Sequence, residues 1–387
     1  MPESRLDAII PSGSIVSVTD ALERARSAGH EVELAPAGDG LRWAIDGVEW
    51  RAGLGSAPRE ALSVLVAAGV APPRLADPGT MALSVFTHLP PSCQSAYQAQ
   101  VAVLHALAPE ALAVYDANAQ TLMGRPSVAD LAAVAVPASP SRLYSIHVVV
   151  HGGLAWLHTH GLRRCGTVEL ELVDVPKGRI ADMKALLAAA AARLIEEAAP
   201  PSLCAAFEVS RETKVCWIPW WEAARKLKTR GPGATRDPAH REGTGVLMAK
   251  PGRWRCCLPH VAIEGRPRVL VSCAETRRMA AGARARWPRF VRLMQAHAGE
   301  EGWSFLAKGS FPAVGPCGPE HLWLAVIDAD TEGWTGEVMS RPCRASIAAG
   351  DLLRNGLPSL SGFQVRSPFG AFGPDDLAEL EAMIEVD

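Results

Sequence analysis

One stretch constrains the fold of this chain more than any other, residues 143–175, which read LYSIHVVVHGGLAWLHTHGLRRCGTVELELVDV. Its first eight residues are rich in β-branched and aromatic side chains, which suit a pleated strand. A Gly-Gly pair at 152–153 follows and can supply the positive φ angles of a two-residue hairpin turn. Residues 154–160 then form the return strand, and the strict alternation of residues 167–175 predicts a third strand.

The two-residue turn fixes which residues of the first two strands face each other. His147 then lies opposite His158, and Ser145 lies opposite His160. Side chains alternate with a period of two, so these four residues share one face of the sheet. Directly opposed Cβ atoms lie roughly 4.5–5.5 Å apart. The register therefore predicts that three histidines gather on a single face.

Two acidic residues of the third strand, Glu169 and Glu171, share one of its faces and lie near the histidines. Imidazole and carboxylate groups at this spacing can bind zinc or a similar divalent ion. In a metal-dependent hydrolase His147, His158 and His160 would be the ligands, and Glu171 or Glu169 would be the general base that polarises a bound water. The alternative, which the residue type alone favours, is that the histidines are half-buried and hydrogen-bonded across a sheet.

The length of the chain, 387 residues, is too great for one ordinary hydrophobic core, so we expect two or three domains. Helical and strand patterns mix throughout, which predicts an α+β fold with helix-backed antiparallel sheets in two α+β parts and a small, mostly β C-terminal module. The predicted divisions are an N-terminal α+β domain at 1–135, a central α+β domain with the histidine hairpin and a basic loop at 140–300, and the β module at 301–387.

Net charge and cysteine content indicate which cellular compartment and which classes of partner suit the protein. The net charge is −2 with 21% charged residues, so nothing draws the whole chain to nucleic acid or to an anionic membrane. The nine cysteines are scattered and form no C-x-x-C pair, which favours reduced thiols over a disulfide framework. The first residues lack the pattern of a secretion signal, and the most apolar helix, 183–195, is too short to span a bilayer. We therefore expect a cytoplasmic protein without membrane contact.

Three further features each have two interpretations. Trp217, Trp220 and Trp221 suit core or inter-domain packing, which we favour, or an exposed contact patch. The basic, Gly/Pro-rich stretch at 225–241 is a solvated surface loop or a contact for a phosphate-bearing ligand. The arginine-rich helix at 277–292 forms surface ion pairs or a basic face for nucleic acid.

Two parts of the chain resemble families of uncharacterised proteins. The hairpin segment resembles the signature of a bacterial family in which W-L-H-T-H-G-L precedes an E-L-E strand. The tail resembles the YegJ-like domain of unknown function, on the matches Glu320-His321-Leu322-Trp323, Gly336-Glu337-Val338, Pro342 and Gly350-Asp351. It departs from that pattern at Ser361-Gly362-Phe363, where an acidic–aromatic pair is more usual.

The resemblance implies a cytoplasmic bacterial protein, and relatives of the tail module in toxin-immunity settings imply a binding role. It carries no catalytic residue over to this chain. The sequence also holds no nucleophile motif, Walker loop or dinucleotide fingerprint, and it leaves open whether the protein is an enzyme. We predict a binding or adaptor protein that acts on another protein in a toxin-immunity or defence setting. The alternative is a metal-dependent hydrolase that uses the histidine-rich face with a divalent metal such as zinc. The oligomeric state is not indicated.

Overall fold

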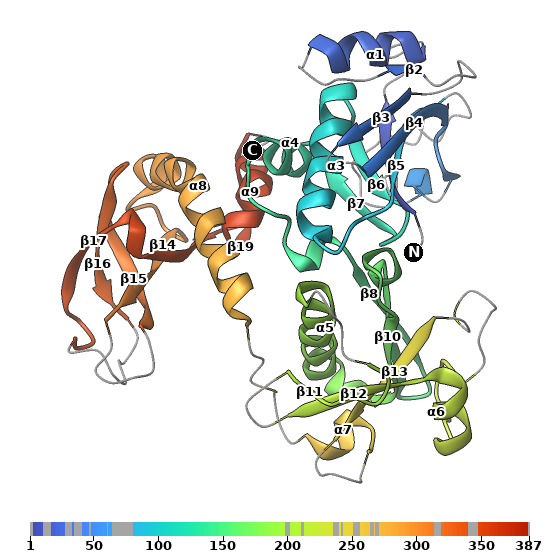
Figure 1. The fold of residues 1–387 in the computed structure, drawn as a ribbon. Helices are drawn as coiled ribbons and strands as arrows, with labels where there is room; N and C mark the ends of the chain where they lie inside the picture. Colours follow the sequence, from blue (N-terminus) through green and yellow to red (C-terminus); the bar gives the residue numbers. More distant parts are fainter. Residues whose placement is uncertain are drawn as a thin grey trace. The chain divides into compact units, whose positions relative to one another are not determined.

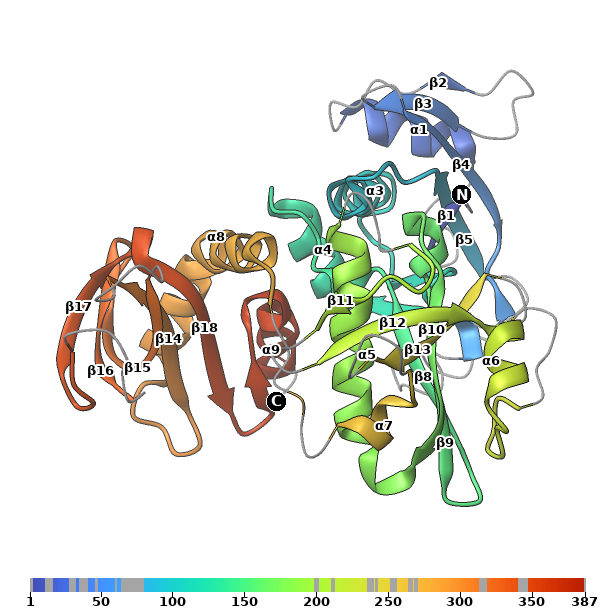
Figure 2. The same ribbon diagram turned by 60° about the horizontal axis from the view of Figure 1, so that its bottom comes forward.

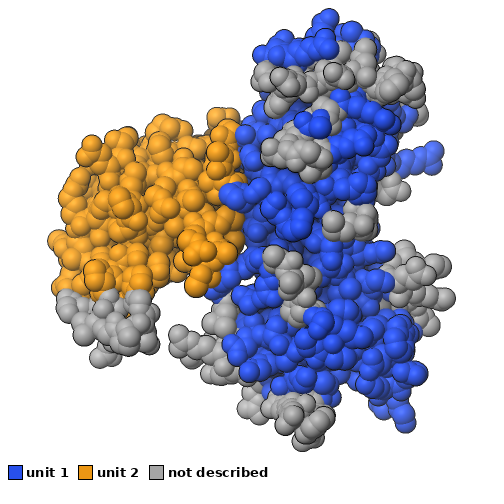
Figure 3. All heavy atoms as spheres, in the orientation of Figure 1, with its two compact units in different colours: residues 1–132, 137–272 blue, residues 133–136, 273–387 orange. Residues whose placement is uncertain are grey.

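The computed structural model describes residues 3–10, 17–27, 33–34, 41–45, 48–59, 61–63, 80–197, 202–209, 213–234, 240, 243–250, 256–263, 267, 271–312, 319–339 and 347–385. By their contacts these residues form two compact units, which Figure 3 shows in different colours: unit 1 comprises residues 1–132 and 137–272, and unit 2 comprises 133–136 and 273–387. The three domains predicted from the sequence have other boundaries and remain predictions.

The first part of unit 1 is a seven-stranded antiparallel sheet with the strand order β2-β3-β4-β5-β1-β6-β7 (Figure 1). Helices α1 (Val18–Ser27) and α3 (Cys93–Leu107) pack against each other, and α3 contacts β1 and β5. Helix α4 (Arg125–Ala133) follows the last strand. The strands are β1 Ser4–Ile10, β2 Glu33–Leu34, β3 Leu41–Ile45, β4 Val48–Ser56, β5 Met81–Thr87, β6 Ala113–Asp116 and β7 Thr121–Gly124.

The second part of unit 1 is a six-stranded sheet with the order β11-β12-β13-β10-β9-β8, so that β8 is an edge strand. Its pairs are antiparallel except for β10 and β13, which run parallel. Figure 2 shows helix α5 (Ile180–Glu196) beside this sheet, and short helices α6 (Trp220–Lys226) and α7 (Pro259–Ala262) border it. The strands are β8 Ser145–His151, β9 Leu154–His160, β10 Glu169–Pro176, β11 Phe207–Glu208, β12 Lys214–Pro219 and β13 Thr244–Ala249.

Alternation along the strands gives this sheet two different faces. On β9, Ala155 and Leu157 belong to the large core that α5 completes through Leu186 and its neighbours. Trp156 points to the opposite face and joins a smaller apolar cluster with Val246 and residues of β12 and α6. His158 and His160 follow Trp156 at steps of two, so they lie on the face away from α5.

Arg164 links the two sheets of unit 1. It lies in a short 3-10 helix, Leu162–Cys165, and is 1% exposed. Its guanidinium donates to the two carboxylate oxygens of Asp116, at the end of β6, at 2.8 and 2.7 Å. It also donates to the carbonyl of Leu143 at 2.7 Å and lies 4.9 Å from the centre of the Tyr97 ring. A bidentate charge pair with further hydrogen bonds offsets the cost of burying both charges.

Unit 2 is a six-stranded antiparallel sheet packed against α8 (Cys273–His297) and α9 (Leu377–Ile384), with the strand order β17-β16-β15-β14-β18-β19. Its core is aromatic: Trp287 of α8 stacks on Phe290 at 4.6 Å and meets Trp334 at 5.4 Å. The strands are β14 Ser304–Phe311, β15 Glu320–Ala329, β16 Gly333–Val338, β17 Leu352–Gly356, β18 Leu360–Ser367 and β19 Gly370–Phe372.

The predicted α+β class is confirmed, with helices packed on three sheets. The sequence did not indicate the parallel pair β10–β13, because a parallel neighbour leaves no local turn signal. None of the helices that the structure describes is long and apolar enough to cross a membrane.

Candidate metal centre

The β8–β9 hairpin has the register predicted from its sequence. His147 pairs with His158, Val149 with Trp156 and Ser145 with His160. The turn residues Gly152 and Gly153 have φ angles of 60° and 82°, the left-handed conformation that glycine adopts without strain. The turn type therefore places the three histidines on one face.

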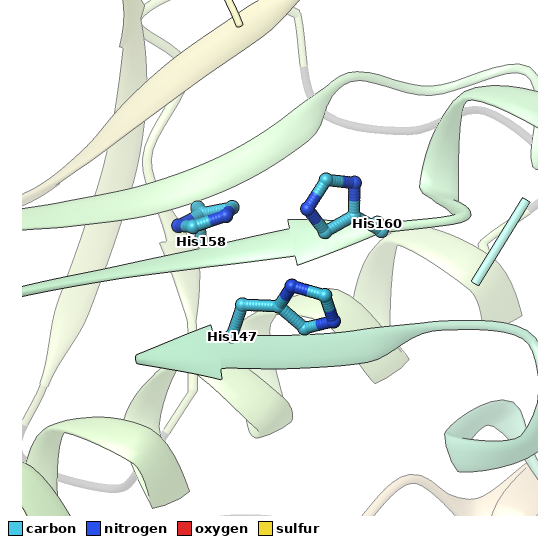
Figure 4. Close-up of side chains that lie close together, drawn as sticks. All are labelled: His147, His158 and His160. Carbon is cyan, nitrogen blue, oxygen red and sulfur yellow. The ribbon is translucent and has the colours of Figure 1, made fainter. Parts of the chain in front are cut away.

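The three histidines lie close enough to share one ion. Figure 4 shows their side chains together, His158 and His160 from one strand and His147 from its neighbour. One nitrogen of each ring lies within 4.8 Å of a nitrogen of the other two. The ring centres of His147 and His160 are 4.5 Å apart, and those of His158 and His160 are 5.0 Å apart. A tetrahedral zinc ion holds its nitrogen ligands about 3.4 Å apart, so small side-chain rotations would close the group on a metal.

The surroundings of His147 favour neutral imidazole, the form that binds metal. His158 is 5% exposed, and His147 and His160 are half-buried. Burial, and then the nearby His240, lower the pKa of His147 below its ordinary value of 6.5. Nitrogen ligands of this kind suit zinc and the neighbouring divalent transition metals.

Glu171 belongs to the same face and is fully buried. It pairs with His158 across β9 and β10, so His147, His158 and Glu171 form one row over three strands. The indole N–H of Trp156 donates to its carboxylate at 2.8 Å. The Trp156 ring in turn stacks on His158, with ring centres 3.9 Å apart and planes 25° apart. Glu171 thus fixes the ring against which a candidate ligand rests.

Glu169 holds the turn that follows His160. Its carboxylate accepts hydrogen bonds from the Thr159 hydroxyl at 2.7 Å, the Gly161 N–H at 2.9 Å and the Arg163 N–H at 3.1 Å. The structure therefore brings the three histidines and Glu171 together. Glu169 is instead hydrogen-bonded to the neighbouring turn.

A fourth histidine, His240, also reaches the group and was missed from the sequence. Its ring centre lies 5.0 Å from that of His158, 5.3 Å from that of His160 and 5.3 Å from the ring of Trp156. It comes from the basic stretch predicted as a solvated loop, of which residues 235–239 and 241 lie outside the described residues. The residue type was the only signal, because no spacing rule relates a loop histidine to a strand about 80 positions earlier.

The tryptophan cluster does not act as one unit. Trp217 packs against the large core, and Trp220 packs against the smaller cluster that contains Trp156. Trp221 is 60% exposed and carries the guanidinium of Arg225 5.2 Å above its ring. Trp217 and Trp220 thus pack as the first interpretation expects, whereas a contact role for the exposed Trp221 stays a prediction.

The arginines of α8 form ion pairs, as the simpler of the two interpretations expects. The partners on the C-terminal tail are Asp375 and Glu381. The arginines paired with them are Arg278, Arg286, Arg289 and Arg292. These pairs account for much of the positive charge that suggested a basic face.

Comparison with known proteins finds a family model that matches part of the chain. No curated protein and no solved structure matches the chain. The expectation of an uncharacterised family is supported for the hairpin segment, whereas the YegJ-like module stays a prediction, and Pro342 of its pattern lies outside the described residues. Residues 146–248, which contain all four histidines of the group, match the model of a family described as protein of unknown function (DUF4026), C-terminal.

Proposed function

We propose that this protein is a metal-dependent hydrolase in which His147, His158 and His160 bind one zinc ion or a similar divalent metal. The observation that carries the proposal is the convergence of three imidazole nitrogens, within 4.8 Å of one another, on one face of a rigid sheet. Three protein ligands leave a fourth position of a tetrahedral ion for water or substrate, which is the arrangement of catalytic rather than structural zinc. The metal would supply Lewis-acid activation of that water.

Within this proposal the protein's own residues have separate roles. The two strands set the spacing of the three ligands, since a hairpin face is more rigid than a loop. Trp156 and Glu171 orient His158 through the stacked ring and the 2.8 Å hydrogen bond. Glu171, rather than Glu169, is the acidic group in register with the ligands, and it is the candidate general base of the pair.

The experiment that tests the proposal is metal analysis of the untagged protein after incubation with zinc and removal of excess ion. We expect about one zinc per chain in the wild type, and loss of that zinc in the double variant His158→Ala, His160→Ala. His151→Ala is the matched control, because His151 is an exposed histidine of the same hairpin and should leave the zinc content unchanged. Wild-type protein without zinc, or equal zinc in all three proteins, would exclude the metal centre.

Activity is the second arm of that experiment. The zinc-loaded wild type should hydrolyse an activated ester such as bis(4-nitrophenyl) phosphate or 4-nitrophenyl acetate, and chelation or the double variant should abolish the hydrolysis. If the protein binds stoichiometric zinc but hydrolyses neither ester in a zinc-dependent way, the metal site would be supported and the hydrolase proposal would be wrong.

A binding or adaptor role is the second candidate, and the edge strand β8 favours it. Val148, Val149 and Val150 are 37%, 43% and 47% exposed, and β8 pairs with β9 alone among the described strands. An exposed apolar edge can receive a strand of another protein. Its toxin-immunity or defence setting rests on the resemblance of the tail alone.

The binding role predicts that Val150→Lys, on the face away from the histidines, reduces co-purification of a partner from host extract. Val261→Lys is the control, because Val261 is 69% exposed but lies on α7. A partner retained equally by both variants would show that β8 is not its docking site.

A further inference from the structure

His240 stands beside the metal ligands without being one of them. Among the described residues, the nitrogens within 4.8 Å of one another belong to His147, His158 and His160 and not to His240. The His240 ring nevertheless lies 5.0 and 5.3 Å from two of these rings, measured between centres. His240 is therefore a neighbour of two of the three candidate ligands.

The described residues before and after His240 contact the sheet. Before it, the carboxylate of Asp174 accepts the N–H groups of Arg230 at 3.1 Å and Gly231 at 2.7 Å. Gly233 lies so close to Trp156 that a Cβ there would be 2.8 Å from the indole. After it, the Thr244 hydroxyl donates to the His240 carbonyl at 3.3 Å. The Thr244 contact ties the backbone of His240 to the first residue of β13, and its ring lies beside those of His158 and His160.

A cationic side chain lies next to the same segment. Arg163 follows His160 by three residues, is exposed, and forms no ion pair with any residue that the structure describes. Its guanidinium packs against Gly243, where a Cβ would lie 2.9 Å from Nε. The hydrogen bond from its backbone N–H to Glu169 fixes its place at the end of β9. Arg163 thus reaches the backbone only three residues after His240.

The carboxylates around this group are already engaged by donors. Glu169 accepts the N–H groups of the turn, Asp174 accepts those of the loop, and Glu171 accepts the indole N–H. Each of these carboxylates thus has a hydrogen-bond donor of its own, and Arg163 is the cationic side chain described beside them. A planar guanidinium is suited to bind the oxygens of a phosphate, and an imidazole N–H can donate a hydrogen bond to them as well.

We propose that His240 and Arg163 form an anion subsite that binds the phosphoryl oxygens of a phosphate-ester substrate beside the metal position. The subsite rests on the proposed function, because it orients the substrate of that same centre. Such a subsite would favour a phosphate ester as the substrate over a neutral ester or amide.

The test is binding of inorganic phosphate to the zinc-loaded full-length protein, measured by titration calorimetry, with zinc content determined on each sample. We expect saturable binding to the wild type, and about tenfold weaker binding in His240→Ala and in Arg163→Ala at unchanged zinc content. Arg225→Ala is the charge-matched control, because Arg225 is exposed on α6 and lies over Trp221. It should bind phosphate as the wild type does.

His240→Gln keeps a side-chain donor and should recover part of the affinity, which a variant that merely disturbs the fold would not. Thermal melting of every variant checks folding. Equal phosphate affinity in the wild type and both alanine variants, or no binding to the zinc-loaded wild type, would overturn the subsite and leave the metal centre standing. A wild type that binds no zinc would overturn the metal centre and the subsite together.

Discussion

Arg164 places a full positive charge inside unit 1. Its hydrogen bonds offset the free-energy cost of burying that charge. Asp116 and Arg164 are both fully buried, so each is the other's main compensation. Removing one partner of such a pair leaves the other charged in a medium of low polarity. Asp116 also accepts the hydroxyl of Tyr97 at 3.0 Å and the backbone N–H of Asn118 at 3.1 Å, which ties the pair to the surrounding core.

Arg164→Met should therefore lower the free energy of unfolding by about 3–5 kcal/mol, measured by urea denaturation of the full chain. Lys214→Met is the control, because the Lys214–Glu208 pair is exposed on both sides and its loss should cost at most about 1 kcal/mol. A cost for Arg164→Met as small as that of the control would mean that the buried pair contributes little.

Glu171 gives a second prediction at this scale, one that concerns the metal. Glu171→Leu removes the acceptor of the Trp156 indole, so the ring and the stacked His158 lose their fixed orientation. Zinc affinity should fall by roughly 10–100-fold, measured by competition with a chromophoric chelator. Glu171→Gln keeps an oxygen acceptor and should lose less. Equal zinc affinity in the wild type and in Glu171→Leu would contradict the orienting role of Glu171.

At the scale of the element, the turn after β9 depends on one glycine. Gly161 has a φ of 113°, and a Cβ there would lie 2.3 Å from the carbonyl oxygen of Leu143. Backbone cannot move aside as a flexible side chain can. The glycine is required both by its backbone conformation and by the close approach of the neighbouring chain.

Gly161→Ala should therefore destabilise the protein by at least about 2 kcal/mol in thermal or urea denaturation. Gly178→Ala is the control, because Gly178 has no neighbour within 4 Å of a Cβ and no positive φ. That change should fall within about 0.5 kcal/mol of the wild type. Similar stabilities for the two variants would contradict the steric argument.

The histidine hairpin was predictable at this scale because its determinants are local. A two-residue turn leaves one register, and that register determines the face of every side chain from Ser145 to His160. His240 was not predictable, since it is distant in the sequence and only the folded sheet brings its ring beside those of His158 and His160. Arg164 was missed for the same reason: a buried arginine looks like a surface arginine until its partner is known.

At the scale of the whole molecule, several histidines make folding sensitive to acid. Burial lowers the pKa of His105, His260 and His321 below the ordinary value of 6.5. The unfolded chain therefore binds protons that the folded chain does not, and stability is lost as pH falls through and below 6.5.

The melting temperature of the metal-free protein should therefore fall between pH 7.5 and pH 5.5, before the carboxylates begin to titrate. Replacing the three histidines by glutamine should flatten that dependence. A melting temperature that is constant or rises on acidification would contradict the sign of the shifts.

The order of the chain also has a consequence for how the centre is assembled. His147, His158 and His160 lie within 14 positions on two strands joined by two residues, so this part can form as soon as one hairpin closes. His240 arrives only after β10, α5 and β12 have been added to the sheet. Under the proposed function, a nascent chain would acquire the ion before the proposed substrate contacts, and the bound ion would favour folding of the hairpin.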